Sequence, residues 1–218
     1  KSDYDKALKY YSQLESMAER KANLLESRMG QLRCNVKLKN DEQTISSAQK
    51  LIATDKVSEE QRREATFAMA QAYASLADWD NAMEKYRAVA TDVKSSEGAQ
   101  SKYLIIQLLY KQEKYDASET EILDFLDKNS PHQFWLGKSY LIWADIFEHR
   151  GDLFQAKQTL LSVIDNYPHQ TDGIIESAKK HVAAIEGKEN APTQNTDKGM
   201  EVDMNKGENS ELFDGKKQ

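Results

Sequence analysis

Apolar and polar residues alternate along the chain with the period of about 3.6 residues that is typical of amphipathic helices. The clearest pair of such segments covers residues 130–168. Its first helix is expected to turn one apolar face inward, made of Trp135, Tyr140, Trp143, Ala144 and Phe147. Its second helix is expected to bury Leu153, Ala156, Leu160, Leu161 and Ile164. Gly151 suits the end of the first helix, and Pro168 ends the second.

Helix-start signals recur before the first helix of each pair. Ser58-Glu59-Glu60-Gln61 predicts a capping box, in which a serine and a glutamine satisfy the first backbone N–H groups. Ser130-Pro131-His132-Gln133 predicts another, with proline at the first helical position. Ser95 and Ser96 open the helix between these two. The turns between paired helices are short, so the pairs are expected to form antiparallel hairpins.

The helix pairs form an internal repeat. Four segments, 2–15, 76–90, 111–126 and 149–164, share a polar or Gly turn, then an aromatic or Leu, then a small and an apolar residue, and 39–53 is a weaker copy. The aligned small residues are Ala7, Thr44, Ala82, Ser118 and Ala156, with spacings of 37, 38, 36 and 38. This steady period predicts a solenoid, in which each hairpin completes its core by stacking on the next.

Small residues are expected where the two helices of a hairpin cross. Ala70 and Ala82 lie twelve residues apart, as do Ala144 and Ala156. Close approach of two helices requires small side chains at the contact, and ridge-into-groove packing then sets their angle. The sequence therefore predicts one alanine from each helix at the crossing.

The pattern resembles the tetratricopeptide repeat (TPR) family. In the last copy Trp143-Ala144, Phe147, Gly151, Ala156, Leu160 and Pro168 match the family pattern, and in the third Met69-Ala70, Tyr73, Ala82 and Tyr86 match. The copy around Ser118 departs, with Ile106 at a usually small position and Glu113 in place of the turn glycine. The copy around Thr44 departs most, and an insertion is expected near residues 37–40. The period also exceeds the family's usual length of about 34 residues.

The resemblance implies an all-α, right-handed α-solenoid of about ten helices with a C-terminal capping helix. We expect a superhelical domain over residues 1–187 and a flexible polar tail over 188–218. The domain divides into a partial repeat (1–20), four repeats (about 22–56, 58–93, 96–129 and 130–168) and a capping helix (171–187). That last helix is amphipathic, and a partner-binding role is the alternative to capping.

Residues 2–11, SDYDKALKYY, are expected to be the second helix of a repeat. Tyr4, Ala7 and Tyr11 occupy the positions that Trp79, Ala82 and Tyr86 hold in a later copy. The matching first helix would then precede residue 1, so this segment is expected to be part of a longer array with an uncapped N-terminal face. Self-association through that face is a further expectation.

The amino-acid sequence of residues 108–168 resembles that of long TPR proteins of Bacteroidetes-type bacteria, including cell-envelope lipoproteins that scaffold outer-membrane assembly. This resemblance implies a periplasmic or outer-membrane-associated location rather than a cytoplasmic one.

Composition narrows the classes of function. The net charge is −6, which argues against nucleic-acid binding because that needs a basic surface. No run of 18 apolar residues predicts a membrane-spanning helix. Cys34 is the single cysteine, which excludes an internal disulfide, and it lies on an apolar-patterned helix. It is expected to be a packed core thiol rather than a nucleophile.

Catalytic and metal-binding motifs are weak. Asp145, Glu148 and His149 share one helix face at i, i+3 and i+4 and could hold a divalent cation, which would suit a metal-assisted enzyme. A solvated polar face is the preferred interpretation of the same spacing. No P-loop, Gly-rich phosphate cradle or GxSxG motif occurs. We therefore predict neither an enzyme nor a bound cofactor or metal.

The remaining hypothesis is protein binding. In a TPR solenoid the first helices line the concave surface, where amides would bond a peptide backbone and aromatic rings would supply apolar contact. The predicted groove residues are Phe67, Gln71, Tyr103, Gln107, Tyr110, Lys111, Leu141, Asp145 and His149. The alternative is that the aromatics pack between repeats and leave a polar groove. The groove lacks the repeated Lys/Asn set that clamps a C-terminal carboxylate in family members, so chaperone-tail recognition is not expected.

The sequence thus favours a protein–protein interaction scaffold that holds a peptide or partner protein on its concave surface. The alternative is a structural spacer or assembly module of the bacterial cell envelope without a dedicated groove. In the polar tail, residues 200–204 and Leu212-Phe213 are two small apolar islands that could be docking peptides, and stray hydrophobic residues are the alternative.

Overall fold

The structure is a computed structural model, and it describes residues 2–189. The predicted docking segments at 200–204 and 212–213, with nearly all of the predicted tail, lie outside this range. Residues 2–189 form ten helices and no strand. The helices are α1 (Ser2–Ser16), α2 (Lys21–Leu38), α3 (Asp41–Ile52), α4 (Glu59–Ser75), α5 (Trp79–Val89), α6 (Ser96–Lys111), α7 (Tyr115–Asp127), α8 (Gln133–His149), α9 (Leu153–Asn166) and α10 (Ile174–Glu189).

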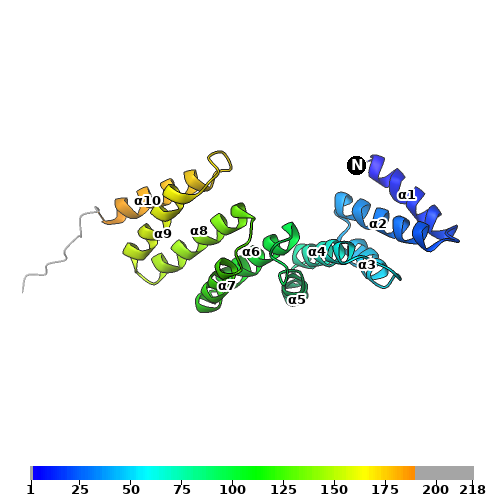
Figure 1. Ribbon diagram of the computed structural model, residues 1–218, viewed down its shortest axis with the longest axis horizontal. Helices are drawn as coiled ribbons and strands as arrows, with labels where there is room; N and C mark the ends of the chain where they lie inside the picture. The colour runs from blue at the N-terminus through cyan, green and yellow to red at the C-terminus, as the bar shows by residue number, and fades with distance from the viewer. Residues whose placement is uncertain (1, 190–218) are drawn as a thin grey trace, which may run out of the picture.

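The helices pack as consecutive hairpins in a bent row (Figure 1). We call α2, α4, α6 and α8 the first helices, and α3, α5, α7 and α9, with which they pair, the second helices. The first helices also contact one another along the row, and α5 and α7 lie on the outer side of the bend (Figure 1). The all-α helical repeat that the sequence predicts is confirmed.

Two of the predicted helix starts are confirmed and one is wrong. Ser58 and Gln61 form a reciprocal capping box at α4, and the Ser95 hydroxyl accepts the Gly98 N–H at α6. At α8, however, His132 precedes the first helical residue and caps nothing with its side chain. Ser130 is buried there, and its hydroxyl donates to the Val93 carbonyl at 2.6 Å. The serine therefore ties the chain to the preceding repeat instead of capping α8.

The hairpin turns share one backbone geometry. Gly151 has φ of +80°, its N–H donates to the Glu148 carbonyl, and the Asp152 N–H donates to the Phe147 carbonyl. These two hydrogen bonds form a Schellman-type helix end, so the predicted role of Gly151 is confirmed.

Small residues meet where paired helices cross. Ala70 and Ala82 lie in one buried cluster, and Ala144 and Ala156 lie in another, all with no exposed surface. Between α6 and α7 the pair is Ile106 with Ser118, whose buried hydroxyl donates to the Ile106 carbonyl at 3.0 Å. The larger isoleucine is therefore accommodated opposite a hydrogen-bonded serine.

The predicted apolar face of α8 is incomplete. Leu136, Ile142 and Ile146 are buried against α6 and α7, whereas Ala144 faces α9 and α10. Trp143 is only half-buried, and its indole N–H donates to Glu119 at 2.8 Å. Because α8 lies between two repeats, it buries side chains on two sides, and a single amphipathic face does not describe it.

The two ends of the row differ. At the C-terminal end, α10 buries Ile174, Ile175, Ala178, Val182 and Ile185 against α9 and α8. Its lysines at 179 and 180 remain exposed, as expected for a capping helix. At the other end, Ala7 and Tyr11 of α1 are only half-buried.

Candidate partner-binding surface

The nine predicted groove residues lie on α4, α6 and α8 but differ in accessibility. Gln71, Lys111 and His149 are exposed, and Tyr103 is buried. The other five are half-buried: Phe67, Gln107, Tyr110, Leu141 and Asp145.

Tyr103 packs between repeats and does not face a groove. Its side chain is 6% exposed, and its ring stacks on Trp135 with centroids 5.3 Å apart. The Gln107 amide donates to the Tyr103 hydroxyl at 2.9 Å, and Lys138 Nζ lies 5.0 Å from the ring centroid. The prediction that Tyr103 offers contact to a ligand is therefore wrong, because the indole of the next first helix covers it.

Phe67 and Leu141 also serve the packing between helices. The Phe67 ring centroid lies 6.2 Å from that of Tyr86, beside the cluster that holds Ala70 and Ala82. Leu141 packs against the cluster between α8, α9 and α10. Each side chain keeps part of its surface accessible, so only that part of Phe67 and of Leu141 could contact a ligand.

Three of the predicted residues come together at one end of the first helices. Tyr110, Asp145 and His149 line a pocket of about 310 Å³ with Glu148 and His181. The His149 ring lies 4.2 Å from that of Tyr115. This pocket joins α6, α8 and α10, and it is the place where predicted residues from different helices are neighbours.

Side chains of α8 and α10 that line this pocket pair with one another. His181 Nε2 lies 2.6 Å from Glu148 Oε2, and His181 Nδ1 lies 3.6 Å from Asp145 Oδ1. Lys188 pairs with the other Glu148 oxygen. Hydrogen bonds from Lys188 and His181 lower the pKa of Glu148. Burial raises the pKa of Asp145, and the nearby His181 opposes that rise.

The alternative cation site at Asp145, Glu148 and His149 does not assemble. Glu148 is engaged by α10, and His149 turns to Tyr115. Within residues 2–189, no three His, Cys, Asp or Glu side chains form a group that could hold a metal ion. Cys34 is 4% exposed, and burial raises the pKa of its thiol, which fits a packed core residue.

Sequence reasoning missed the contribution of α10 to this surface. His181 and Lys188 belong to a helix that the sequence assigned to capping, and their partners lie 33 and 40 residues earlier. Their seven-residue spacing does put both on one helix face, which is the signal that was available. Which helix that face would meet depends on tertiary packing.

Residues 133–169 match the model of the tetratricopeptide repeat family. That match covers the α8–α9 hairpin, and TPR repeats generally mediate protein–protein interactions in typically non-enzymatic scaffolds. The chain is similar in fold to the crystal structure of BtubC (BKLC) from P. vanneervenii. The TM-score is 0.57 at 13% identity, over 99% of this chain and 97% of that one.

No curated protein matches the sequence. No helix in the described part of the chain has the length and apolar character that crossing a membrane requires.

Proposed function

We propose that this chain is a protein–protein interaction scaffold that binds a peptide or partner protein on the inner surface of its helical row. The observation that carries the proposal is the stack of TPR-like hairpins, whose first helices keep polar side chains accessible. Gln71 and Lys111 are two such residues, on α4 and α6. Their amide and ammonium groups suit the backbone and acidic groups of a partner.

Partner recovery from a lysate of the source cells tests the scaffold function. The double variant Gln71→Ala/Lys111→Glu changes both of these exposed side chains. We expect it to lose partners that the unaltered chain retains. The matched control, Gln49→Ala/Lys50→Glu, makes the same substitutions at exposed residues of α3, which is a second helix. Equal recovery by both variants would contradict binding on the inner surface.

A second candidate function is an assembly module of the bacterial cell envelope. The N-terminal edge supports it, because α1, α2 and α4 border an open pocket of about 810 Å³ that includes the half-buried Ala7 and Tyr11. A helix from a second copy could cover this edge. Light scattering that detects concentration-dependent assembly, abolished by Tyr11→Lys but unchanged in Gln71→Ala/Lys111→Glu, would favour this function. Cell fractionation tests the envelope location.

A further inference from the structure

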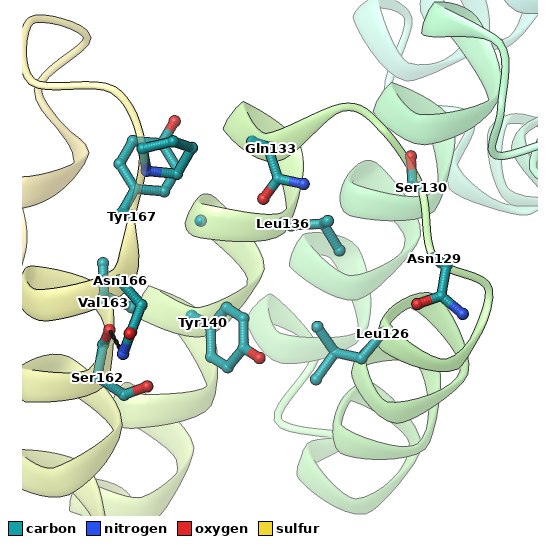
Figure 2. A pocket seen from close by; sticks show the side chains of 12 residues that line it. Leu126, Asn129, Ser130, Gln133, Leu136, Tyr140, Ser162, Val163, Asn166 and Tyr167 are labelled. Atoms are coloured by element: carbon teal, nitrogen blue, oxygen red, sulfur yellow. Dashed lines mark hydrogen bonds between the residues drawn. The ribbon is translucent and has the colours of Figure 1, made fainter.

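A groove without charge lies between two second helices, and most of its lining residues belong to the part of the chain that matches the family model. It has a volume of about 450 Å³, and the C-terminal ends of α7 and α9 lie on either side of the first half of α8 (Figure 2). Leu136 and Val163 are buried beneath it, whereas Leu126 and Tyr140 are half-buried and Gln133 is exposed beside them (Figure 2). We call it the neutral groove, because all 12 residues that line it are uncharged.

This lack of charge is unusual for the molecule, in which 30% of the residues are charged. Four other pockets on the same chain each include at least three charged or titratable side chains. The neutral groove therefore does not reflect the average surface.

The preceding repeat has the corresponding groove, between α5 and α7, and charged side chains line that groove. Positions 38 residues apart correspond as Lys102 to Tyr140, Asp124 to Ser162 and Lys128 to Asn166. The first member of each pair is charged and the second is not.

Ion pairs join α6 to α7 at the α5–α7 groove. Lys102 Nζ pairs with both Glu121 and Asp124, and Lys128 Nζ lies 2.8 Å from Asp124 Oδ2. The lysine at 102 is 4% exposed, so these charges satisfy one another inside the groove. The neutral groove has no such network, and its volume is larger, at about 450 Å³ against about 360 Å³.

Polar groups around the neutral groove keep hydrogen-bonding capacity. Among residues 2–189, no side chain or backbone group forms a hydrogen bond with the Gln133 side-chain amide or the Tyr140 hydroxyl. Asn166 uses its Nδ2 to bond the Ser162 carbonyl at 3.0 Å, and Asn129 uses its Nδ2 on the Asp127 carbonyl at 2.9 Å. Each asparagine therefore still offers its amide oxygen. Amides and hydroxyls supply both donors and acceptors, as a peptide backbone requires.

We propose that the neutral groove binds a short extended segment of a partner protein, uncharged at its centre, which places one apolar side chain against the half-buried Leu126 and Tyr140. A charged side chain there would lose water without gaining a counter-charge, and this penalty selects against it. The proposal rests on the scaffold function and adds a second contact area, on a different face of α8 from Lys138 and Asp145.

Selection from a phage-displayed library of random dodecapeptides, with the full chain as bait, tests the proposal. Enriched peptides are expected to share an uncharged stretch with one large apolar residue. Their dissociation constants are then measured by fluorescence anisotropy. Ser162→Asp restores the charge found at position 124 and should weaken binding about tenfold. Gln158→Asp, one turn earlier on α9 and outside the groove, is the control and should leave affinity unchanged.

Three results would overturn the neutral groove as a partner site. Peptides that bind equally to Ser162→Asp and Gln158→Asp would place binding elsewhere, and recovery of no peptide would remove the site. Displacement of the peptides by a synthetic peptide of residues 190–218, or a dimer that Ser162→Asp dissociates, would make the chain itself the occupant. The scaffold function is judged separately, by partner recovery with Gln71→Ala/Lys111→Glu.

Discussion

At the residue scale, the hairpin turns place four residues with positive φ at equivalent positions. Gly151 has φ of +80°, whereas Lys39, Ala77 and Glu113 each have φ of +59°. Only the glycine could be recognised from the sequence, because residues with a Cβ disfavour this conformation. The other three turns form the same pair of backbone hydrogen bonds without a glycine.

Exchanging the turn residues should change stability in opposite directions. Gly151→Ala adds a Cβ to a left-handed residue and is expected to lower the free energy of unfolding by about 1 kcal/mol. Glu113→Gly relieves the same strain and should raise the free energy of unfolding. The gain should be only about 0.5 kcal/mol, because glycine also increases the entropy of the unfolded chain, which opposes it. Urea denaturation followed by circular dichroism measures both. A shift of the same sign in the two variants would contradict this account.

Tyr103 shows how one aromatic residue can mislead a sequence-based site prediction. Its position on the first helix matches the groove register, yet Trp135 stacks on it and Lys138 lies over the ring. Helical periodicity gives the direction of a side chain but not what the next repeat places there.

Substitutions at Tyr103 should separate packing from binding. Tyr103→Ala leaves a cavity between α6 and α8 and is expected to lower the free energy of unfolding by about 3 kcal/mol. Tyr103→Phe removes only the hydroxyl that accepts from Gln107 and should cost about 1 kcal/mol. Thermal unfolding and partner recovery are measured on both. Partner loss in Tyr103→Phe without a change in stability would restore Tyr103 as a binding residue.

At the element scale, α10 is tied to α8 by charge as well as by its apolar face. The Glu148 carboxylate pairs with both His181 and Lys188, and its side chain is 19% exposed. The apolar face of α10 could be predicted from its periodicity, but the ion pairs could not, because they join positions 33 and 40 residues apart.

The lowered pKa of Glu148 predicts the acid dependence of stability. A carboxylate whose pKa is lower in the folded state stabilises the fold above its ordinary pKa, and this contribution disappears as pH falls through the folded-state pKa. Glu148→Gln should therefore lower the free energy of unfolding by about 1 kcal/mol at pH 7 and by less at pH 3. Glu176→Gln, whose carboxylate pairs only with the exposed Lys180, is the control. An equal loss at both pH values would contradict a role for the ionised carboxylate.

At the scale of the whole molecule, stability should vary along the row. Each hairpin contacts only its neighbours, so the ends have fewer partners than the middle. Ala82 and Tyr86 are 0% and 3% exposed, whereas their equivalents Ala7 and Tyr11 are half-buried. The N-terminal edge is therefore expected to open most easily.

Hydrogen–deuterium exchange measured by mass spectrometry can test this gradient. Amides of α1 should exchange fastest among the helices and those of α6 and α8 slowest, because local opening near an edge breaks fewer buried contacts. Tyr11→Ala should accelerate exchange in α1 and α2 without affecting α8. Uniform protection along residues 2–189 would indicate one cooperative unit and contradict the gradient.

The sequence by itself determined the helices, the repeat and the small residues at the crossings, because these depend on periodicity and on contacts within one hairpin. Ser58, Gly151 and the Ala144–Ala156 pair are examples. Tertiary structure alone decided which side chains remain accessible. Stacking of neighbouring repeats covered Tyr103 and directed the Ser130 hydroxyl to the Val93 carbonyl instead of the start of α8. It also left an uncharged groove between α7 and α9. The reason is that burial in a solenoid depends on residues about 38 positions away, which no local pattern contains.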